Sequence, residues 1–487
     1  MMKQRIIKYS LPVRIVDSNI ELSKLSLLLQ ERDDQISLCE PNLISLQKGD
    51  YFILDFGVEM CGGIRLIIGD NGEIRPNMKL HIRFGESVSE AYSTLGEKGA
   101  CNDHSIRDFE VEVPSLSDQH FGDTGFRFVR IDVLESTPIA HPIKAVYAWQ
   151  YDYQHKVINE YKSEDPRINE IYDTCVRTLT LCMQNRIWDG IKRDRLVWIG
   201  DMEPEVHALL HVYGNIPLLE ETLLTAMRAN PMPCWINGIP SYSVWFLLIM
   251  YDLFSIGHET NFIKNNQKYM DDIIELLNKC VIANDLDFDK VKLSYGMKNF
   301  IDWPSYKEDN EQERKDTNIL LLKYVMPKVL EMYDSISLTN ENLLNLLNKL
   351  ETIYVAIPTT KVFAAFYQLV YKDEKSYKLL VEGNSKGMST FMSYYVLKAI
   401  ASKDKGKALE ITKEYYGAML DLGATTFFED FNIDWAKDSC RIDEINNDNK
   451  KDLHGDHGEH CYLGFRHSLC HGWSVGPISF LIEEDIK

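Results

Sequence analysis

Acidic, basic and aromatic side chains are concentrated in one stretch of the sequence, RIWDGIKRDRLVWIGDMEPE, which covers residues 186–205. Three aspartates alternate there with arginines and tryptophans, and two glycines interrupt the helical pattern. Carboxylates accept hydrogen bonds from hydroxyl groups, and an indole face can cover the C–H face of a sugar ring. The stretch therefore predicts a carbohydrate site. Its candidate residues are Asp189, Arg193, Asp194, Trp198 and Asp201.

Two of these aspartates also have purely structural interpretations. Asp201 directly precedes a predicted helix and could serve as its N-cap. Asp194 lies between two arginines and could form a structural ion pair with either of them. The spacing of the residues does not decide between these interpretations and a role in binding.

A second candidate is Glu429, in the stretch LGATTFFEDFNIDW at residues 422–435. It follows a glycine, two threonines and two phenylalanines at the end of a predicted helix. An apolar pocket around such a carboxylate would raise its pKa, which prepares a side chain for general acid or base catalysis. The alternative is an ordinary solvated acid in a loop.

The stretch HGDHGEHCYLGFRHSLCHGWSVGP, residues 454–477, contains five of the thirteen histidines together with two cysteines and two carboxylates. This composition raises the question of a zinc site. The histidine spacing and the lack of CxxC and HExxH patterns argue against one, so we expect no metal. We prefer the interpretation that this stretch presents His471 and Trp473 to a sugar pocket over a metal site, and a plain structural loop is the alternative that stays open.

Composition excludes several classes of protein. The 487 residues are 45% hydrophobic and 26% charged, which is typical of a globular chain of two or three domains. With 53 basic and 73 acidic residues the formal net charge is −20, so a nucleic-acid partner is not expected. We expect neither a signal peptide nor a membrane span, because no apolar run is long enough. Ten cysteines without CxxC pairs favour free thiols and a cytoplasmic location. Whether the chain forms a homodimer is left open.

The period of the hydrophobic pattern changes near Trp149. Before it, short segments such as 51–57, 79–83 and 126–133 alternate or run apolar between turn residues, which predicts an antiparallel β-sandwich over residues 1–150. After a linker at 151–165, about twelve helical segments follow, including 203–213, 242–257 and 259–282. They predict an (α/α)6 barrel over 166–487. A helical solenoid would give a similar count, although no repeat of fixed period is visible.

The loops between helices of such a barrel gather at one end. Two of them carry further candidates: Trp235 in CWING, and Asp302 and Trp303 in FIDWP. We expect these three residues to meet Asp194 and Glu429 around one pocket.

The motifs DGIKRDRLVWIGD, GATTFFE and HSLCHGWSVGP resemble those of the inverting α-L-rhamnosidases, whose catalytic domain is an α/α six-hairpin barrel preceded by β-sandwich domains. The likeness extends to FILDFGVEMCGG, RFGES and TGFRFVRI in the N-terminal part, so it covers most of the chain. The resemblance implies that Asp189 and Asp201 bind sugar, that Asp194 is the general acid, and that Glu429 is the general base.

The resemblance has two departures. The family commonly has Glu at the position of Asp194, and Glu203 and Glu205 are nearby carboxylates that could take the acid's role instead. Many relatives also continue into a C-terminal β domain beyond the point where this sequence stops. The expected activity is an inverting glycosidase that needs no cofactor and removes a terminal sugar from a carbohydrate substrate. The alternatives are a non-catalytic carbohydrate-binding relative, and a lyase or phosphorylase on the same barrel.

Overall fold

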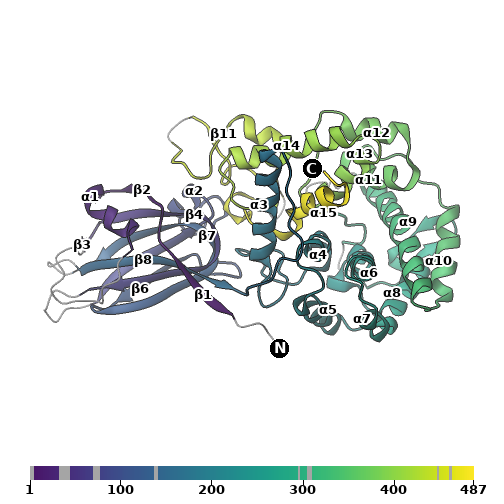
Figure 1. Ribbon diagram of the computed structural model, residues 1–487, viewed down its shortest axis with the longest axis horizontal. Coiled ribbons are helices and arrows are strands. Elements are labelled where there is room, and N and C mark those ends of the chain that lie inside the picture. Colours follow the sequence, from purple (N-terminus) through teal and green to yellow (C-terminus); the bar gives the residue numbers. More distant parts are fainter. Residues whose placement is uncertain are drawn as a thin grey trace.

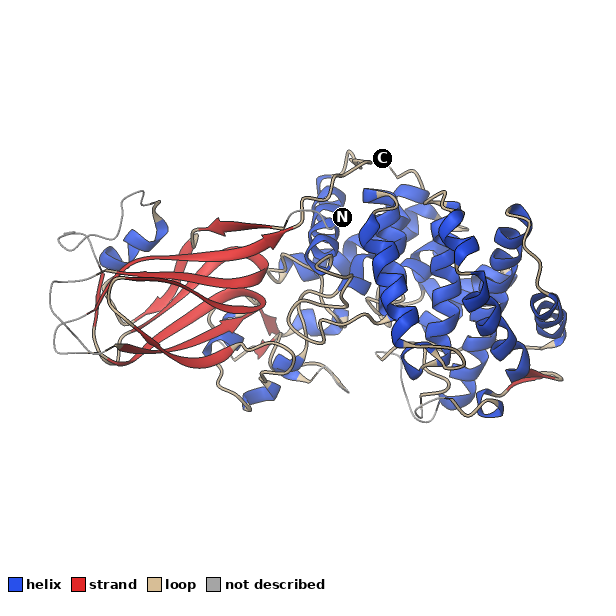
Figure 2. Cartoon of the chain, turned by 90° about the horizontal axis from the view of Figure 1, so that it is seen from below, coloured by secondary structure: helices blue, strands red, loops and turns tan. Residues whose placement is uncertain are grey.

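The fold is described from a computed structural model of the 487-residue chain. The structure describes residues 5–31, 44–69, 77–136, 141–293, 297–303, 310–446, 449–459 and 463–486. A β-rich N-terminal part and a helical C-terminal part lie end to end along the long axis of the molecule (Figures 1 and 2).

The N-terminal part is built on an antiparallel sheet whose strands follow the order β1-β8-β4-β7-β5-β6, with β2 paired to β4 and β3 paired to β8. The pairing of its long strands β4 and β7 is interrupted by irregularities, because their register shifts between Asp55 and Met60 and again between Gly62 and Ile64. This shift lets one end of β4 pair with β2 and the other end pair with β8. The strands are β1 (Ile6–Ser10), β2 (Arg14–Ser18), β3 (Ile44–Leu46), β4 (Tyr51–Ile68), β5 (Met78–Gly85), β6 (Asp108–Val113), β7 (Ser117–Glu135) and β8 (His141–Asp152).

Six helices of the C-terminal part pack against one another in a closed cycle: each contacts the next, and the last, α15, returns to the first, α4. They are α4 (Ile199–Tyr213), α6 (Pro240–Ser255), α9 (Glu311–Ser335), α11 (Lys361–Tyr371), α13 (Ser393–Ala401) and α15 (Gly476–Glu483). These helices alternate along the chain with α3 (Pro166–Cys182), α5 (Pro217–Ala229), α7 (Asn261–Asn265), α8 (Gln267–Cys280), α10 (Glu341–Thr352), α12 (Glu374–Val381) and α14 (Lys405–Asp421). The cycle buries a continuous apolar core, and none of the described helices has the length and apolar character of a membrane span.

Several predicted elements differ from the structure. The helix expected at 203–213 begins four residues earlier, at Ile199. The helix expected at 259–282 is broken at Asn266 into α7 and α8. The strand expected at 51–57 continues to Ile68 in β4, and the strand expected at 126–133 is part of β7, which begins at Ser117. Residues 22–29 form the short helix α1 (Leu22–Leu25) followed by a 3₁₀ turn.

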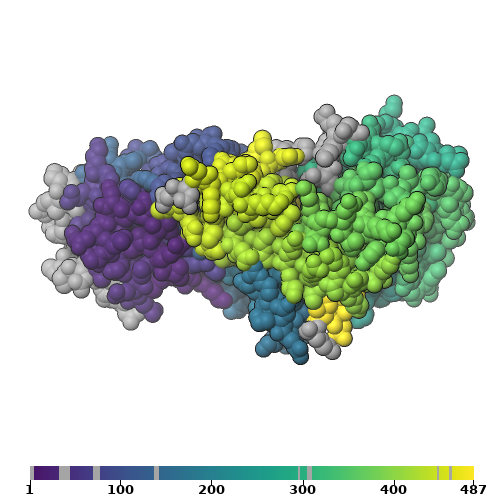
Figure 3. Space-filling model, turned by 90° about the horizontal axis from the view of Figure 1, so that it is seen from above, coloured from purple at the N-terminus to yellow at the C-terminus, as the bar shows by residue number. Residues whose placement is uncertain are grey.

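The two parts meet at a cluster of buried charges. The ammonium group of Lys192, in the loop between α3 and α4, lies 2.9 Å from Glu86 and 3.3 Å from Glu90, both on the β-rich part. It also donates to the carbonyl of His467 at 2.6 Å. Glu86 in turn accepts from the backbone N–H of Leu469 at 2.6 Å. Three segments that are distant in the sequence are therefore held together, and the C-terminal loops fill the space between the parts (Figure 3).

We expect the substitution Lys192→Met to destabilise the protein strongly. It would leave the Glu86 carboxylate in a buried site without its cation, and breaking one side of a buried ion pair costs about 3–5 kcal/mol. The matched control is Lys98→Met, because Lys98 pairs with Asp456 on the surface at 2.6 Å and such pairs contribute about 0–1 kcal/mol. Urea denaturation measures both free energies of unfolding, and equal losses would contradict the structural role of Lys192.

Candidate active site

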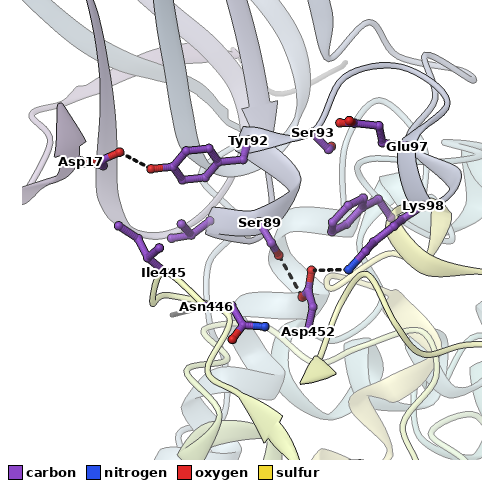
Figure 4. A pocket seen from close by; sticks show the side chains of 11 residues that line it. Asp17, Ser89, Tyr92, Ser93, Glu97, Lys98, Ile445, Asn446 and Asp452 are labelled. Atoms are coloured by element: carbon purple, nitrogen blue, oxygen red, sulfur yellow. Dashed lines mark hydrogen bonds and ion pairs between the residues drawn. The ribbon is translucent and has the colours of Figure 1, made fainter. Parts of the chain in front are cut away.

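Two of the cavities formed by the described residues are candidates for a functional site. One, of about 870 Å³, lies where Ser89 and Lys98 of the β-rich part face Asp452, and where Tyr92 is directed toward Asp17 (Figure 4). Lys98 lies 3.8 Å from Asp452, and Tyr92 donates to Asp17. The other cavity, of about 230 Å³, collects four carboxylates and three tryptophans. Its lining is Asp189, Arg193, Asp194, Trp198, Asp201, Ile239, Tyr242, Met297, Trp303, Glu429, Arg466, His471 and Trp473. The smaller cavity therefore holds the candidate site.

The loop before α4 is folded back on itself, which brings its aspartates into the cavity. Asp189 and Leu196 are joined by two hydrogen bonds: the N–H of Asp189 donates to the Leu196 carbonyl at 3.1 Å, and the Leu196 N–H donates to the Asp189 carboxylate at 2.9 Å. Between them, Asp194 and Arg195 take left-handed backbone conformations, with φ of 37° and 56°. Such conformations cost free energy for residues other than glycine and are concentrated at functional sites.

Glu429 is held by a second pair of segments that lie side by side. Its N–H donates to the Ser468 carbonyl at 3.0 Å, and the Ser468 N–H donates back to its carboxylate oxygen Oε2 at 2.9 Å. The Trp473 indole donates to the Glu429 carbonyl at 2.8 Å. Main chain and side chain are thus both fixed, so the other carboxylate oxygen, Oε1, keeps one direction.

One guanidinium group connects the two loops. Arg193 donates through Nη2 to Oε1 of Glu429, and its Nη1 lies 3.3 Å from Oδ1 of Asp194. Asp194 also accepts from the Trp198 indole N–H at 3.0 Å. Because a single planar guanidinium contacts both carboxylates, the positions of Asp194 and Glu429 depend on each other.

Burial dominates the electrostatics of the remaining acids. It raises the pKa of Asp201 to about 8, although the Tyr242 hydroxyl donates to Asp201 at 2.8 Å and opposes the shift. Burial, reinforced by the charges of Asp201 and Asp194, raises the pKa of Asp189 well above its usual range. Burial and the Arg193 charge lower the pKa of His471, which favours the neutral imidazole. The cavity therefore offers protonated acids and a neutral histidine beside Arg193.

The helix start at Ile199 bears on the interpretation of Asp201 as a cap. Trp198 is the N-cap residue of α4, and Asp201 lies in the first turn, where its carboxylate faces Tyr242 instead of a backbone N–H. The interpretation of Asp201 as an N-cap is therefore wrong.

Nine of the eleven residues that the sequence singled out line the cavity. Trp235 does not: it is 1% exposed and packs edge-on against Phe288, with ring centroids 5.6 Å apart. Asp302 does not either, because it is fully buried and accepts a hydrogen bond from Ser389 at 2.6 Å. Both belong to the supporting core and not to the cavity wall.

Four residues of the lining were not anticipated: Ile239, Tyr242, Met297 and Arg466. Tyr242 was assigned to the start of an apolar helix. The position of Tyr242 could have been predicted, because Tyr242 and Asp201 lie in the first turns of α6 and α4. These two helices are neighbours and both begin at the same end of the domain. Arg466 and Met297 lie in loops whose course the sequence pattern does not define.

The histidine-rich stretch is divided among several environments. His454 contacts Ser87 at 2.8 Å, His467 accepts from the Asp430 N–H at 2.8 Å, and His471 lines the cavity. His460 and Cys461 lie outside the described residues. Ligand atoms of Asp189, Asp201 and His471 come within 4.8 Å of one another, which is close enough for a shared cation. The adjacent Arg193 guanidinium disfavours a metal ion at that place.

Comparisons with known proteins place the fold. No family model matches the chain, and no curated protein matches it. Among solved structures, the fold is similar to a rhamnosidase from Klebsiella oxytoca with rhamnose bound, with a TM-score of 0.74 and 16% identity over 99% of this chain and 96% of that one. A GH78 family rhamnosidase of Bacillus sp. GL1 has a TM-score of 0.71 and 15% sequence identity over 94% of this chain. The Streptomyces avermitilis α-L-rhamnosidase complexed with L-rhamnose has a TM-score of 0.66 and 14% sequence identity over 98% of this chain. The chain spans 48% and 44% of the last two. These similarities establish that the chain has the fold of the solved α-L-rhamnosidases.

The pKa of Asp201 predicts a pH-dependent cost in stability. An aspartate in the unfolded chain has a pKa near 3.9, whereas Asp201 in the folded chain has a pKa of about 8. The folded chain therefore keeps a proton that the unfolded chain loses. The stability that protonated Asp201 contributes at low pH is lost as the pH rises through about 8. We therefore expect Asp201→Asn to melt at a higher temperature than the wild type, with a difference that grows between pH 5 and pH 8. Asp173→Asn, at an exposed aspartate, should change the melting temperature little. A constant difference for Asp201→Asn would contradict the expected titration.

Proposed function

We propose that the protein is a glycoside hydrolase of the α-L-rhamnosidase type that cleaves a terminal sugar with inversion of configuration. The observation that carries the proposal is the pair Asp194 and Glu429, two carboxylates from separate loops that face one small cavity and are joined by Arg193. Two carboxylates on either side of a glycosidic bond are the basic requirement of this reaction. The similar structures are rhamnosidases, two of them described with rhamnose bound, which supports the same sugar here.

The cavity suits one sugar ring. Its volume of about 230 Å³ lies below the roughly 300–1,000 Å³ typical of sites for drug-sized ligands. Asp189 and Asp201 are acids that can exchange hydrogen bonds with ring hydroxyls, and His471 adds a neutral imidazole between them and Glu429. Trp198, Trp303 and Trp473 offer apolar surface to the C–H face of the ring and to a deoxysugar methyl group.

In the proposed reaction Asp194 donates its proton to the glycosidic oxygen as the bond to the anomeric carbon breaks. Glu429 takes a proton from a water molecule, whose oxygen attacks the opposite face of the oxocarbenium-like centre. The bond electrons leave with the aglycone, and both carboxyl groups have exchanged protonation states at the end. Arg193 touches both, so it fixes their separation and balances the charge that moves between them.

The shorter side chain of Asp194 is compatible with the acid's role in this geometry. The left-handed backbone at Asp194 and Arg195 advances the carboxyl group toward the cavity, where Trp198 and Arg193 hold it. Glu203 and Glu205 are fully buried and are not among the residues that line the cavity. We therefore assign the acid to Asp194 and not to either glutamate.

The architecture that we propose is a β-sandwich over residues 1–150, a linker at 151–165 and an (α/α)6 barrel over 166–487. The closed cycle of six helices supports the barrel, with the helices that alternate with them on the outside. The bulged strands β4 and β7, which let one sheet fold over a common core, support the sandwich. The candidate site lies at the end of the helix cycle where α4 and α6 begin.

Substitution of the two carboxylates should have different effects on substrates with good and poor leaving groups. Glu429→Gln should abolish release of nitrophenol from nitrophenyl α-L-rhamnoside, because water activation is needed whatever the leaving group. Asp194→Asn should lower kcat about 100-fold or more on an alkyl or flavonoid rhamnoside and far less on the nitrophenyl substrate, since a good leaving group needs little protonation.

Wild-type protein that gains thermal stability from L-rhamnose yet releases no nitrophenol would contradict hydrolysis and support a binding protein. An ultraviolet-absorbing unsaturated product, or turnover that requires phosphate, would show a lyase or a phosphorylase instead. Equal losses for Asp194→Asn on both kinds of substrate would move the acid to another residue.

A further inference from the structure

A histidine of the β-rich part reaches the candidate acid. His104 lies between the 3₁₀ turn at Glu97–Gly99 and strand β6, and its ring nitrogen Nδ1 is 3.0 Å from Oδ1 of Asp194. Its side chain is 41% exposed, so nothing in the packing of a core requires a histidine at this position. Asp194 is contacted from three directions, by His104, Arg193 and Trp198.

The residues on either side of His104 are anchored to the catalytic loops. The Ser105 hydroxyl is buried, donates to the carbonyl of Lys192 at 2.6 Å and contacts Thr124 at 2.8 Å. Asp103 pairs with Arg466, which lines the cavity, at 3.2 Å. The segment around His104 therefore packs against the loop that carries Asp194. Its contact with Lys192 is made only two residues before Asp194 in the chain.

The backbone of His104 is itself constrained. Its φ of 64° lies in the left-handed region, which is unfavourable for a residue with a Cβ atom. The anchors at Asp103 and Ser105 keep this conformation, and it turns the imidazole toward Asp194. Strain that surrounding contacts maintain at an exposed position points to a function in the site.

We propose that His104 is a positioning residue for Asp194, so that the β-rich part completes the active site of the helical part. The inference rests on the proposed function, because it concerns the acid of that reaction. An aspartate is one methylene shorter than a glutamate and must be aimed more narrowly at the glycosidic oxygen. Contacts to Oδ1 from His104 and Arg193, and to Oδ2 from Trp198, leave its carboxyl group one orientation.

The charged and titratable groups around this contact come from both parts of the protein. Asp103 and Arg466 lie on the His104 side. Arg193, Asp189, Asp201, Glu429 and His471 face Asp194 from the helical part. His104 is not among the residues that line the cavity, so the β-rich part contacts Asp194 from outside that lining.

The experiment compares His104→Ala, His104→Asn and His104→Gln on dinitrophenyl and alkyl α-L-rhamnosides. His104→Ala should lower kcat about tenfold on the alkyl substrate and less than twofold on the dinitrophenyl substrate, since only the first depends on the aim of the acid. His104→Asn should recover most of the loss, because its amide nitrogen occupies nearly the place of Nδ1 and asparagine tolerates a positive φ. His104→Gln should not recover it. Melting temperatures should stay close to that of the wild type.

His120→Ala is the matched control, because His120 is another histidine of the β-rich part and contacts Tyr9 instead of Asp194. It should leave both rates unchanged. The inference is overturned if His104→Ala slows both substrates equally, changes neither, or is not rescued by asparagine. If Asp194→Asn still discriminates between the two substrates in those cases, the proposed function stands and only the role of His104 fails. If the wild type cleaves neither substrate, both are overturned.

Discussion

The arrangement of the site depends on one buried cation, the guanidinium of Arg193. A buried charge is tolerated only when it is paired, and Arg193 finds its partners in Asp194 and Glu429, which are 235 positions apart in the chain. Its third donor bonds the carbonyl of Arg466 at 3.1 Å, so the C-terminal loop is tied to the same group. A single side chain therefore joins the loops that carry Asp194 and Glu429.

The β-rich part provides a second layer of support. Lys192, next to Arg193 in the chain, places its ammonium group among Glu86, Glu90 and the carbonyls of the C-terminal loop. Glu86 also accepts from Ser468 and Leu469, and Ser468 is the residue whose N–H holds Glu429. Without the sheet, Ser468 would lose the Glu86 contact that supports it behind Glu429, and Asp194 would lose its contact with His104.

Much of this arrangement could be predicted from the sequence, because local periodicity reports local structure. Strands and helices were recognised wherever the alternation was strong, and the clustering of aspartates, arginines and tryptophans located most of the cavity. The failures occurred where tertiary contacts decide the outcome. Trp235 and Asp302 have residue types suited to a sugar site yet are buried against Phe288 and Ser389. His104 carries no local signal, since its importance arises from a strained backbone and a contact across the two parts.

In the proposed reaction Glu429 delivers water to the face of the sugar opposite the bond that Asp194 helps to break. Proton NMR of the first sugar released from nitrophenyl α-L-rhamnoside, recorded before mutarotation, tests this directly. With inversion, β-L-rhamnose forms first and the α anomer appears only later. Initial formation of α-L-rhamnose would contradict it, because retention requires one carboxylate to act as a nucleophile on the sugar itself.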